Sequence, residues 1–202
     1  MLATWATSAN ERFQAAGIHY VDCPVSGGPA RALIGELTLM VSGDVESLTK
    51  ARPVLDALGK EVHIIEGGAG FGSTVKCVHQ LLAGVHICAA AEAMSMAAKA
   101  GLDVEQLYRI VNGAAGASWM FTDRGQRMLS ADPDVKSALD IFVKDMDIVY
   151  SEAKAIQCPI PLASAALQQF ISGQCLGLGK SDDSQVVKVY ERITGVSVLT
   201  EK

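Results

Sequence analysis

The stretch "GGAGFGSTVKCVHQLLAGVHICAAAEAMSMAAKAG", residues 67–101, decides the fold that this sequence predicts. From about Ser73 to Ala100 most positions are alanine or another apolar residue, and Gly101 follows as a helix-ending glycine. The pattern predicts one helix of unusual length. Because apolar residues occur nearly all round it, we expect most of its surface to be buried.

The residues before this helix predict an α/β arrangement. Asp44 caps a predicted helix that runs to residue 59, and residues 1–17 are typical of a weakly amphipathic helix. Short apolar runs indicate strands at 17–25, 35–43 and 60–67. These strands and one full helix cannot cover both faces of a parallel sheet, so we expect further α/β elements before Met1.

The residues after the long helix predict helices only. Asp103 caps the next helix, with Gln106 in the capping-box position, and Ser118 caps another. Further helices are predicted near 141–156, 162–175 and 184–193. We therefore expect the tail of an α/β domain over residues 1–70 and an all-α domain over residues 71–202. The predicted fold class is α+β to mainly α.

Composition narrows the class of protein. Half of the 202 residues are hydrophobic and 19% are charged, which is enough for one or two domains with a filled core. The net charge of -5, with scattered basic residues, gives no electrostatic reason to expect nucleic acid as a partner. No secretory signal is visible at the N-terminus. Gly84, His86 and Glu92 interrupt the longest apolar stretch, so we predict no membrane span.

Cysteine and histidine usage argues against a metal centre. The five cysteines are odd in number and form no CxxC pair, so we expect them to be reduced, buried and intracellular. The four histidines form no HxxxH or HExxH pattern, so no catalytic metal is predicted.

The long helix carries a stripe of polar residues that could take part in catalysis. Lys76, His79, Ala83, His86 and Ala90 are spaced by three and four residues and share one face. Burial of a lysine one turn into such a helix would favour the neutral amine that proton transfer needs. The alternatives are a lysine that extends to solvent and histidines that only pack and form hydrogen bonds.

Two glycine-rich runs could contact a ligand. Residues 67–72 are not a complete dinucleotide fingerprint, because no acidic residue ends a following strand about 20 residues on. In "PVSGGPA", residues 24–30, the group Ser26, Gly27 and Gly28 forms either a tight turn or a backbone cradle for a small anion.

A further segment, "LDIFVKDMDIV" at residues 139–149, contains Lys144 and Asp145. A solvated helix face explains these two charges locally. Trp119 with Arg124 or Arg127 lines a cleft or simply packs, and the local pattern does not choose between these interpretations.

Three separated motifs together resemble the β-hydroxyacid dehydrogenase family, which includes the 3-hydroxyisobutyrate dehydrogenases. These are "DCPVSGGPARALIGELTLMVSGD", "GGAGFGSTVKCVHQLLAGVHICAAAEAM" and "LDIFVKDMDIV", and the resemblance extends over nearly all of the chain. The run "STVK..HQLLAGVHI.AAAEAM" is most similar to the threonate dehydrogenase branch.

The resemblance implies a Rossmann domain, a long connecting helix and an all-α C-terminal domain like that of 6-phosphogluconate dehydrogenase. The C-terminal domain of this family often packs against a second subunit, so a homodimer or homotetramer is expected. The resemblance also places the GxGxxG phosphate loop and the ribose selector before Met1. The chain is then expected to be a fragment of a longer protein or a product that has lost its cofactor half.

Site roles are implied by the same resemblance. Lys76 matches the catalytic lysine, and Ser26, Gly27 and Gly28 match the cradle for the substrate carboxylate. Lys144 matches a lysine that reaches the cofactor. His79 stands where the family usually has asparagine, in a substrate-binding position, so the exchange bears on substrate preference. Gln80 follows the family pattern in a supporting role.

The implied activity is NAD(P)-dependent oxidation of small hydroxy acids of threonate or 3-hydroxyisobutyrate type. The cofactor is NAD or NADP, since the residue that selects between them is not in this sequence, and the fragment is expected to be inactive alone. The alternative is a non-catalytic dimerisation or interaction module derived from the same fold. A cytoplasmic location is expected, and a mitochondrial one is compatible with an N-terminus that precedes Met1.

Overall fold

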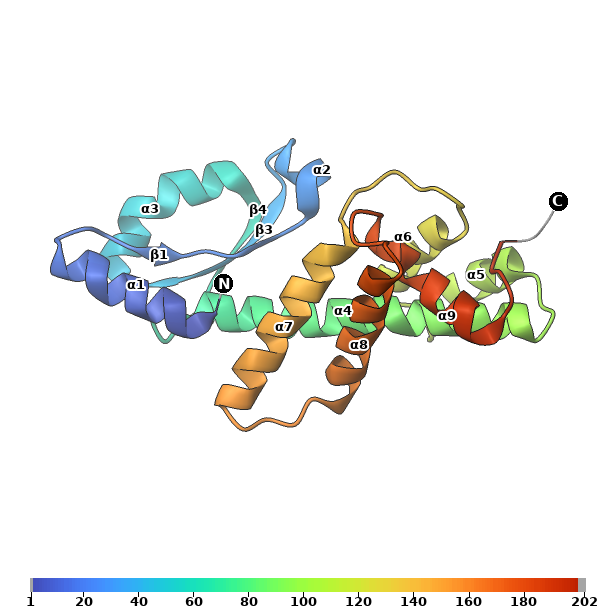
Figure 1. The fold of residues 1–202 in the computed structure, drawn as a ribbon. Helices are drawn as coiled ribbons and strands as arrows, with labels where there is room; N and C mark the ends of the chain where they lie inside the picture. The colour runs from blue at the N-terminus through green and yellow to red at the C-terminus, as the bar shows by residue number, and fades with distance from the viewer. Residues whose placement is uncertain (1, 200–202) are drawn as a thin grey trace. The chain divides into compact units, whose positions relative to one another are not determined.

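The computed structural model describes residues 2–199. The chain divides into two compact units, Met1–His79 and Gln80–Lys202. Helix α4, Phe71–Lys99, begins in the first unit and continues in the second, and it confirms the long helix predicted from about Ser73 to Ala100 (Figure 1).

The first unit combines a small sheet with helices (Figure 1). Before α4, its elements are α1 (Ala3–Ala15), β1 (Val21–Asp22), β2 (Val25–Ser26), α2 (Gly28–Ala32), β3 (Leu37–Gly43), α3 (Val45–Leu58) and β4 (Gly59–Ile64). The predicted strands are therefore confirmed in position, although the first is split into two short pieces.

Strands β1 and β2 are two parts of one interrupted strand. Val21 pairs with Gly43 and Val25 pairs with Leu39, so both parts run antiparallel to β3 in a single register. Between them the Pro24 carbonyl still accepts a hydrogen bond of 2.9 Å from the Met40 N–H. Proline has no N–H to donate, which explains the interruption.

The sheet is mixed, which corrects the expectation of a purely parallel arrangement. β4 pairs with β3 in parallel, with Leu39 opposite Val62, while β1 and β2 pair with β3 antiparallel. Helix α3 connects β3 to β4, as a parallel pair requires a crossover connection. Asp44 caps α3 as predicted, because its carboxylate accepts from the Ser47 N–H at 2.8 Å.

A compact apolar cluster holds α3 on this sheet. Leu39 and Val41 of β3 are fully buried and pack with Leu55 of α3. Val21 and Val62, from the strands on either side of β3, pack against the same cluster. The strand that pairs on both sides is thus also the centre of the core, and its neighbours are fixed relative to it.

The second unit is helical. After α4 its elements are α5 (Val104–Asn112), α6 (Trp119–Met128), α7 (Leu139–Ala155), α8 (Pro161–Cys175), the short 3-10 helix η1 (Asp183–Val186) and α9 (Val187–Thr194). Between Phe71 and Leu199 no strand is present, only an isolated bridge between Ala138 and Asp182. The coarse fold class, mainly helical with a small sheet, is therefore confirmed.

The predicted caps of the second unit are confirmed at two helices. The Asp103 carboxylate accepts from the Gln106 N–H at 3.1 Å, and the Ser118 hydroxyl accepts from the Phe121 N–H at 3.0 Å. The last predicted helix begins differently, because residues 183–186 form a 3-10 turn that Asp182 caps. Such tight turns are common at helix N-termini.

Helix α4 is long and apolar enough to cross a membrane by length and composition alone, so the interruptions noted in the sequence do not exclude a span on those grounds. Half of its most apolar 18-residue window is buried inside the protein. The fully buried side chains include Ile87 and Met94. A buried core helix passes the same composition test.

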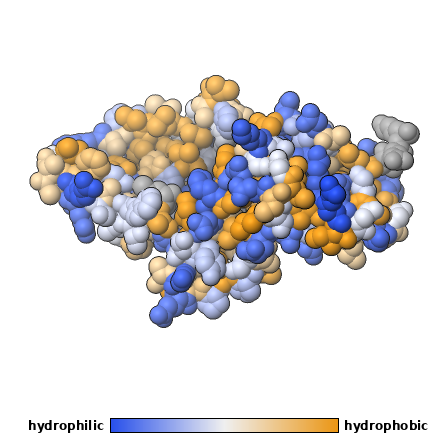
Figure 2. Space-filling view, viewed as in Figure 1, coloured by the Kyte–Doolittle hydropathy of each residue, from blue (hydrophilic) through white to orange (hydrophobic). Residues whose placement is uncertain are grey.

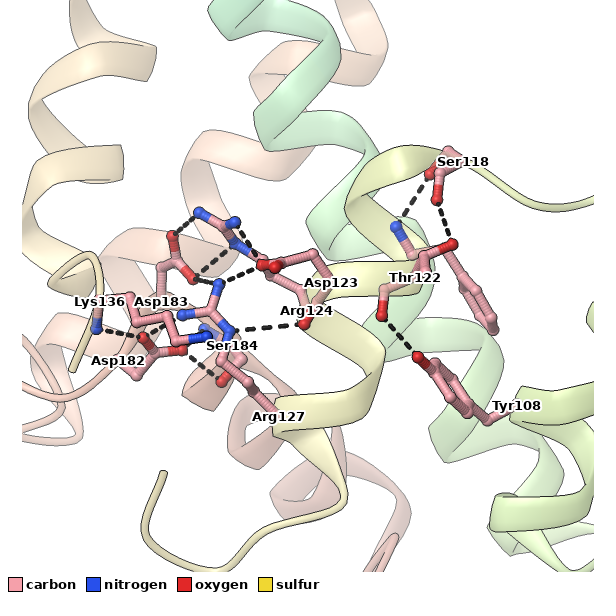
Figure 3. A network of polar contacts seen from close by, with 11 residues as sticks. Tyr108, Ser118, Thr122, Asp123, Arg124, Arg127, Lys136, Asp182, Asp183 and Ser184 are labelled. Atoms are coloured by element: carbon pink, nitrogen blue, oxygen red, sulfur yellow. Dashed lines mark hydrogen bonds and ion pairs between the residues drawn. The ribbon is translucent and has the colours of Figure 1, made fainter. Parts of the chain in front are cut away.

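The second unit is fastened by a buried network of charges (Figure 3). Arg124 of α6 donates two hydrogen bonds to the Asp183 carboxylate, at 3.0 and 2.8 Å. Arg127 pairs with Asp182, and Asp123 accepts from both arginines at 2.7 Å. These contacts tie α6 to η1, so the two arginines have a structural explanation.

The cysteines are free, as predicted, but the prediction that all are buried is wrong. Cys158 and Cys175 are exposed, because Cys158 lies in the loop between α7 and α8 and Cys175 is the last residue of α8. Cys88 of α4 is buried. Burial, with a smaller effect of Glu92, raises the pKa of the Cys88 thiol to about 12, so this thiol is inert.

Candidate active site

The turn at Ser26, Gly27 and Gly28 leaves the edge of the small sheet. Ser26 ends β2 and pairs with Thr38 of β3, which fixes its backbone. Gly27 then serves as the N-cap of the short helix α2. The first amide groups of any helix have no acceptor inside it. The turn and the cradle foreseen in the sequence are therefore compatible, since one feature can serve as both.

Backbone conformation explains both glycines. Gly27 has φ 132° and Gly28 has φ 64°, values that residues with a side chain rarely adopt. A Cβ added to Gly28 would meet no atom within 4 Å, whereas one added to Gly27 would meet the Arg31 side chain at 2.9 Å. The space beside Gly28 is therefore open to an approaching group.

Asp22 fastens the start of helix α4 to the same interrupted strand. Its side chain is 2% exposed and accepts hydrogen bonds from the Ser73 N–H at 2.8 Å, the Ser73 hydroxyl at 2.7 Å and the Gly70 N–H at 3.1 Å. Ser42 of β3 accepts from the Gly72 N–H at 2.9 Å. The N-terminal amides of α4 are thus satisfied by buried side chains of the sheet.

These hydrogen bonds decide whether the glycine-rich turn before α4 can bind a phosphate group. A dinucleotide pyrophosphate would need free N–H groups at a helix N-terminus. At Gly70, Gly72 and Ser73 those groups already donate to Asp22 and Ser42. The turn does not fit a pyrophosphate, in agreement with the sequence interpretation that its fingerprint is incomplete.

Close packing also fixes this turn. A Cβ on Gly72 would overlap the carbonyl oxygen of Met40 and lie 3.1 Å from that of Asp22. Both obstacles are backbone atoms of the sheet, which cannot move aside as a flexible side chain could. The start of α4, and with it the position of the residues one turn later, is therefore set directly by the strands.

Lys76 and His79 follow on α4, three residues apart and on one face. Both are half-buried. The His79 Nε2 atom lies 3.2 Å from the Ser26 hydroxyl oxygen, across 53 residues of sequence. The structure thus brings together Ser26 and His79, with Gly27 and Gly28 next in the chain and Lys76 one helical turn before His79.

His86, on the same predicted stripe, has different surroundings. It lines an apolar groove of the second unit with Ala93 and Phe121 among others. No hydrogen bond joins it to the residues around Ser26 in the part of the chain that the structure describes. The contact with Ser26 therefore distinguishes His79 from His86 as a candidate site residue, a distinction that the sequence alone did not provide.

Lys144 belongs to the second unit and lies on α7. Its side chain is 65% exposed, and its ammonium pairs with Asp145 at 2.7 Å. The other oxygen of Asp145 accepts a 2.6 Å hydrogen bond from Gln80 of α4. Gln80 thus connects α4 to α7, in line with the supporting role expected for it. Lys144 is an exposed cation whose immediate partner is held in place.

Sequence reasoning missed Asp22, Ser42 and Ser73 as a group. The signal that could have found them is a helix start with no capping side chain immediately before it, "GAGFGS", preceded by strands that end in polar residues. The nearby Cys23 is not a reactive thiol, because burial and then Asp22 raise its pKa. Within residues 2–199 no cluster of three or more metal-ligating side chains is found.

Comparison with known proteins identifies the family. Residues 70–190 match the family described as NAD-binding of NADP-dependent 3-hydroxyisobutyrate dehydrogenase, and residues 2–68 match the NAD binding domain of 6-phosphogluconate dehydrogenase. Because these matches extend over most of the chain, it belongs to the β-hydroxyacid dehydrogenase family. Within the family, similarity to proteins named L-threonate dehydrogenase places it in the threonate branch.

Comparison with individual proteins shows how similar the chain is to them in sequence and structure. The chain is 48% identical to L-threonate dehydrogenase of Escherichia coli O6:H1 over 88% of its own length and 59% of that protein. It is 44% identical to the Haemophilus influenzae L-threonate dehydrogenase over 96% of its length and 64% of that protein. A crystal structure of 3-hydroxyisobutyrate dehydrogenase from Salmonella typhimurium superposes with a TM-score of 0.87 at 47% identity, covering 93% and 66% of the two chains. The chain thus spans about 60% of the length of the curated relatives that it matches.

Proposed function

We propose that this chain carries the substrate-binding and proton-transfer residues of an NAD- or NADP-dependent dehydrogenase of small hydroxy acids, of the threonate or 3-hydroxyisobutyrate type. The observation that carries the proposal is the contact of 3.2 Å between Ser26 and His79, one helical turn from Lys76. A hydroxyl donor, backbone amides and an amine in one neighbourhood suit a hydroxy acid, which presents a carboxylate and an alcohol.

In this proposal the carboxylate of the substrate lies against the turn at Ser26, Gly27 and Gly28. The Ser26 hydroxyl and the backbone amides donate to it, and the open space beside Gly28 admits its oxygens. Both glycines are needed for the backbone conformation rather than for packing. A carboxylate held there fixes one end of a short substrate, so its hydroxyl has few positions left to occupy.

Lys76 is then the general base for oxidation. Its neutral amine accepts the proton of the substrate hydroxyl, and in the reverse direction its ammonium returns that proton to the carbonyl oxygen. When bound, the nicotinamide accepts the hydride that leaves the carbinol carbon. Half-burial of Lys76 on α4 supports this role, because a less hydrated amine gives up its proton more readily.

Among the described residues, Lys144 fits a cofactor in charge and exposure. Its side chain is 65% exposed, so its ammonium can reach an anionic ligand with little loss of hydration. We propose that it contacts the cofactor, while the phosphate loop itself is supplied by sequence other than the glycines before α4.

We also propose that residues 1–70 form the C-terminal part of a Rossmann-type dinucleotide-binding domain and that residues 71–202 form the helical domain. The parallel pairing of β3 with β4 through helix α3 supports this, since that crossover is the repeating unit of such domains. The family match of residues 2–68 to an NAD binding domain supports it as well.

The experiment measures hydride transfer by the protein as it is encoded, with NAD and NADP, on a panel that includes threonate and 3-hydroxyisobutyrate. Lys76→Ala should lower kcat by about 10²- to 10⁴-fold, the usual contribution of a general acid–base group. Lys60→Ala is the matched control, since Lys60 is an exposed lysine of β4 paired with Glu36 at 3.3 Å.

Equal rates for Lys76→Ala and wild type would sink the assignment of Lys76. A wild type that transfers no hydride to either cofactor, but still self-associates, would instead favour a non-catalytic dimerisation module.

A further inference from the structure

The hydrogen bond between Ser26 and His79 is a cross-link between the interrupted strand and helix α4. Another joins Asp22 to Ser73. Asp22 and Ser26 are four residues apart on the strand, about 13 Å at 3.3 Å per residue. Ser73 and His79 are six residues apart on the helix, about 9 Å at 1.5 Å per residue. The imidazole side chain can span this difference, so both cross-links can form together.

This arrangement preorganises the pair. The backbone of Ser26 is held by its pairing with Thr38 of β3. The helix that carries His79 is held at its start by Asp22 and Ser42, which belong to the same sheet. Neither partner therefore has to be ordered when a ligand arrives, which reduces the entropic cost of binding.

The Ser26–His79 hydrogen bond has two possible directions, and only one of them leaves the Ser26 hydroxyl free to donate to an anion. If the imidazole accepts the serine proton, the Ser26 oxygen presents only lone pairs, which repel a carboxylate. If the Nε2–H of His79 donates to the serine oxygen, the hydroxyl proton is left to donate to the carboxylate. A bound carboxylate selects the second direction.

We propose that His79 is a positioning residue for the carboxylate of the hydroxy-acid substrate and acts through Ser26, by donating from Nε2 and so turning the serine hydroxyl outward. The inference rests on the proposed function for the identity of the ligand, and it assigns a role to the histidine that stands in place of asparagine. A donor is required at the position of Nε2, which lies farther along the side chain than an asparagine amide reaches.

The first test is a kinetic comparison on the encoded protein. His79→Leu should raise KM for the hydroxy acid about 10-fold, the value of one hydrogen bond to a charged group, with kcat changed less than about 3-fold. His79→Gln, whose amide nitrogen takes the place of Nε2, should bring KM most of the way back to the wild-type value. His79→Asn should bring KM back less far. His63→Leu is the control, because His63 is exposed on β4 and contacts only Glu61 at 3.3 Å among the hydrogen bonds described.

A double-mutant cycle shows whether His79 acts through Ser26. Ser26→Ala should raise KM by a similar factor, and the Ser26→Ala, His79→Leu double variant should be no worse than Ser26→Ala alone. With the substrate amide, whose carbonyl oxygen accepts only an uncharged and weaker hydrogen bond, His79→Leu should raise KM less than with the carboxylate. Additive effects in the cycle, or an equal loss with the amide, would overturn the proposal in favour of a packing role.

A binding measurement separates this inference from the proposed function. Nitrogen NMR of His79 should show Nε2 becoming the protonated nitrogen when 3-hydroxyisobutyrate is added, and this response should be lost in Ser26→Ala. If hydride transfer fails but the response is seen, the dehydrogenase proposal is overturned and the role of His79 stands. If hydride transfer occurs and the response is absent, only the role of His79 is overturned.

Discussion

Asp22 is the side chain on which the geometry of the site depends most directly. One buried carboxylate satisfies the Ser73 and Gly70 amides and the Ser73 hydroxyl, and it also accepts from Ser42 at 3.3 Å. The turn so held sets where α4 begins, and Lys76 and His79 follow within two turns. A structural carboxylate thus determines the position of residues that it does not touch.

We expect Asp22→Ala to destabilise the first unit by about 3 kcal/mol or more, since several buried donors lose their acceptor and each is worth roughly 1–3 kcal/mol. Asp22→Asn should cost less, because its amide oxygen still accepts from some of them. Urea unfolding measures both. Glu61→Ala, which removes an exposed carboxylate from the same sheet, is the matched control. A loss for Asp22→Ala no larger than that of the control would contradict this account.

The residues that sequence reasoning located best are those marked by their own neighbours. Ser26, Gly27 and Gly28 stand out because two glycines interrupt strand material, and Asp103 and Ser118 because each directly precedes a helical pattern. The contact between Ser26 and His79 was not visible, because it joins positions 53 residues apart. The mixed sheet was also missed, since strand direction depends on which edges pair and not on the period of each strand.

Helix α6 shows how an element can be fixed by charge. Its Arg124 is 12% exposed and faces the fully buried Asp183 of η1, with a hydrogen bond from each of two guanidinium nitrogens. Burial raises the pKa of Asp183 above its ordinary value, although Arg124 acts to lower it. Arg124, with a smaller effect of Arg127, thus opposes the burial that disfavours the charged form of this carboxylate.

Arg124→Ala should destabilise the second unit by about 3–5 kcal/mol at neutral pH, because it removes both of its hydrogen bonds to the buried Asp183 carboxylate and leaves that carboxylate with Arg127 at 3.8 Å. Arg109→Ala, which removes an exposed arginine 4.0 Å from Glu105 on α5, should cost less than about 0.5 kcal/mol. Denaturant unfolding at pH 7 measures both values. Similar losses for the two variants would contradict a structural role for the network.

The same variant predicts a pH dependence with a definite sign. Without Arg124 the pKa of Asp183 rises further, and a group whose folded pKa is raised adds stability below its unfolded pKa that is lost as pH rises through the folded value. The gap between wild type and Arg124→Ala should therefore narrow as the pH falls from 7 toward 4.5. A gap that widens in this range would show that Asp183 is not the group left unpaired.

The second unit exposes an apolar groove between α4, α5 and α6, with a volume of about 570 Å³. It is lined by alanines of α4 together with Met96, Val111 and Phe121. Met96 is 74% exposed, more than any other exposed large apolar side chain of α4 among the described residues, such as Val78 at 57%. Hydrophobic residues reach the surface at several places on the face seen in Figure 2. The homodimer or homotetramer that the family resemblance implies would cover this groove.

Met96→Glu should then convert the assembled protein to a monomer, because a carboxylate would be buried without a partner at the centre of the interface. Ile156→Glu is the control, since Ile156 is 72% exposed at the end of α7 and does not line the groove. Analytical ultracentrifugation over a range of protein concentrations measures the assembly, and the urea midpoint of the monomer checks its fold. A wild type that sediments as a monomer at tens of micromolar, or a Met96→Glu variant that assembles as well as Ile156→Glu, would show that the groove is not the interface. Assembly through this groove would couple the subunit contact to the helix that carries Lys76, because α4 lines the groove and is continuous from Phe71 to Lys99.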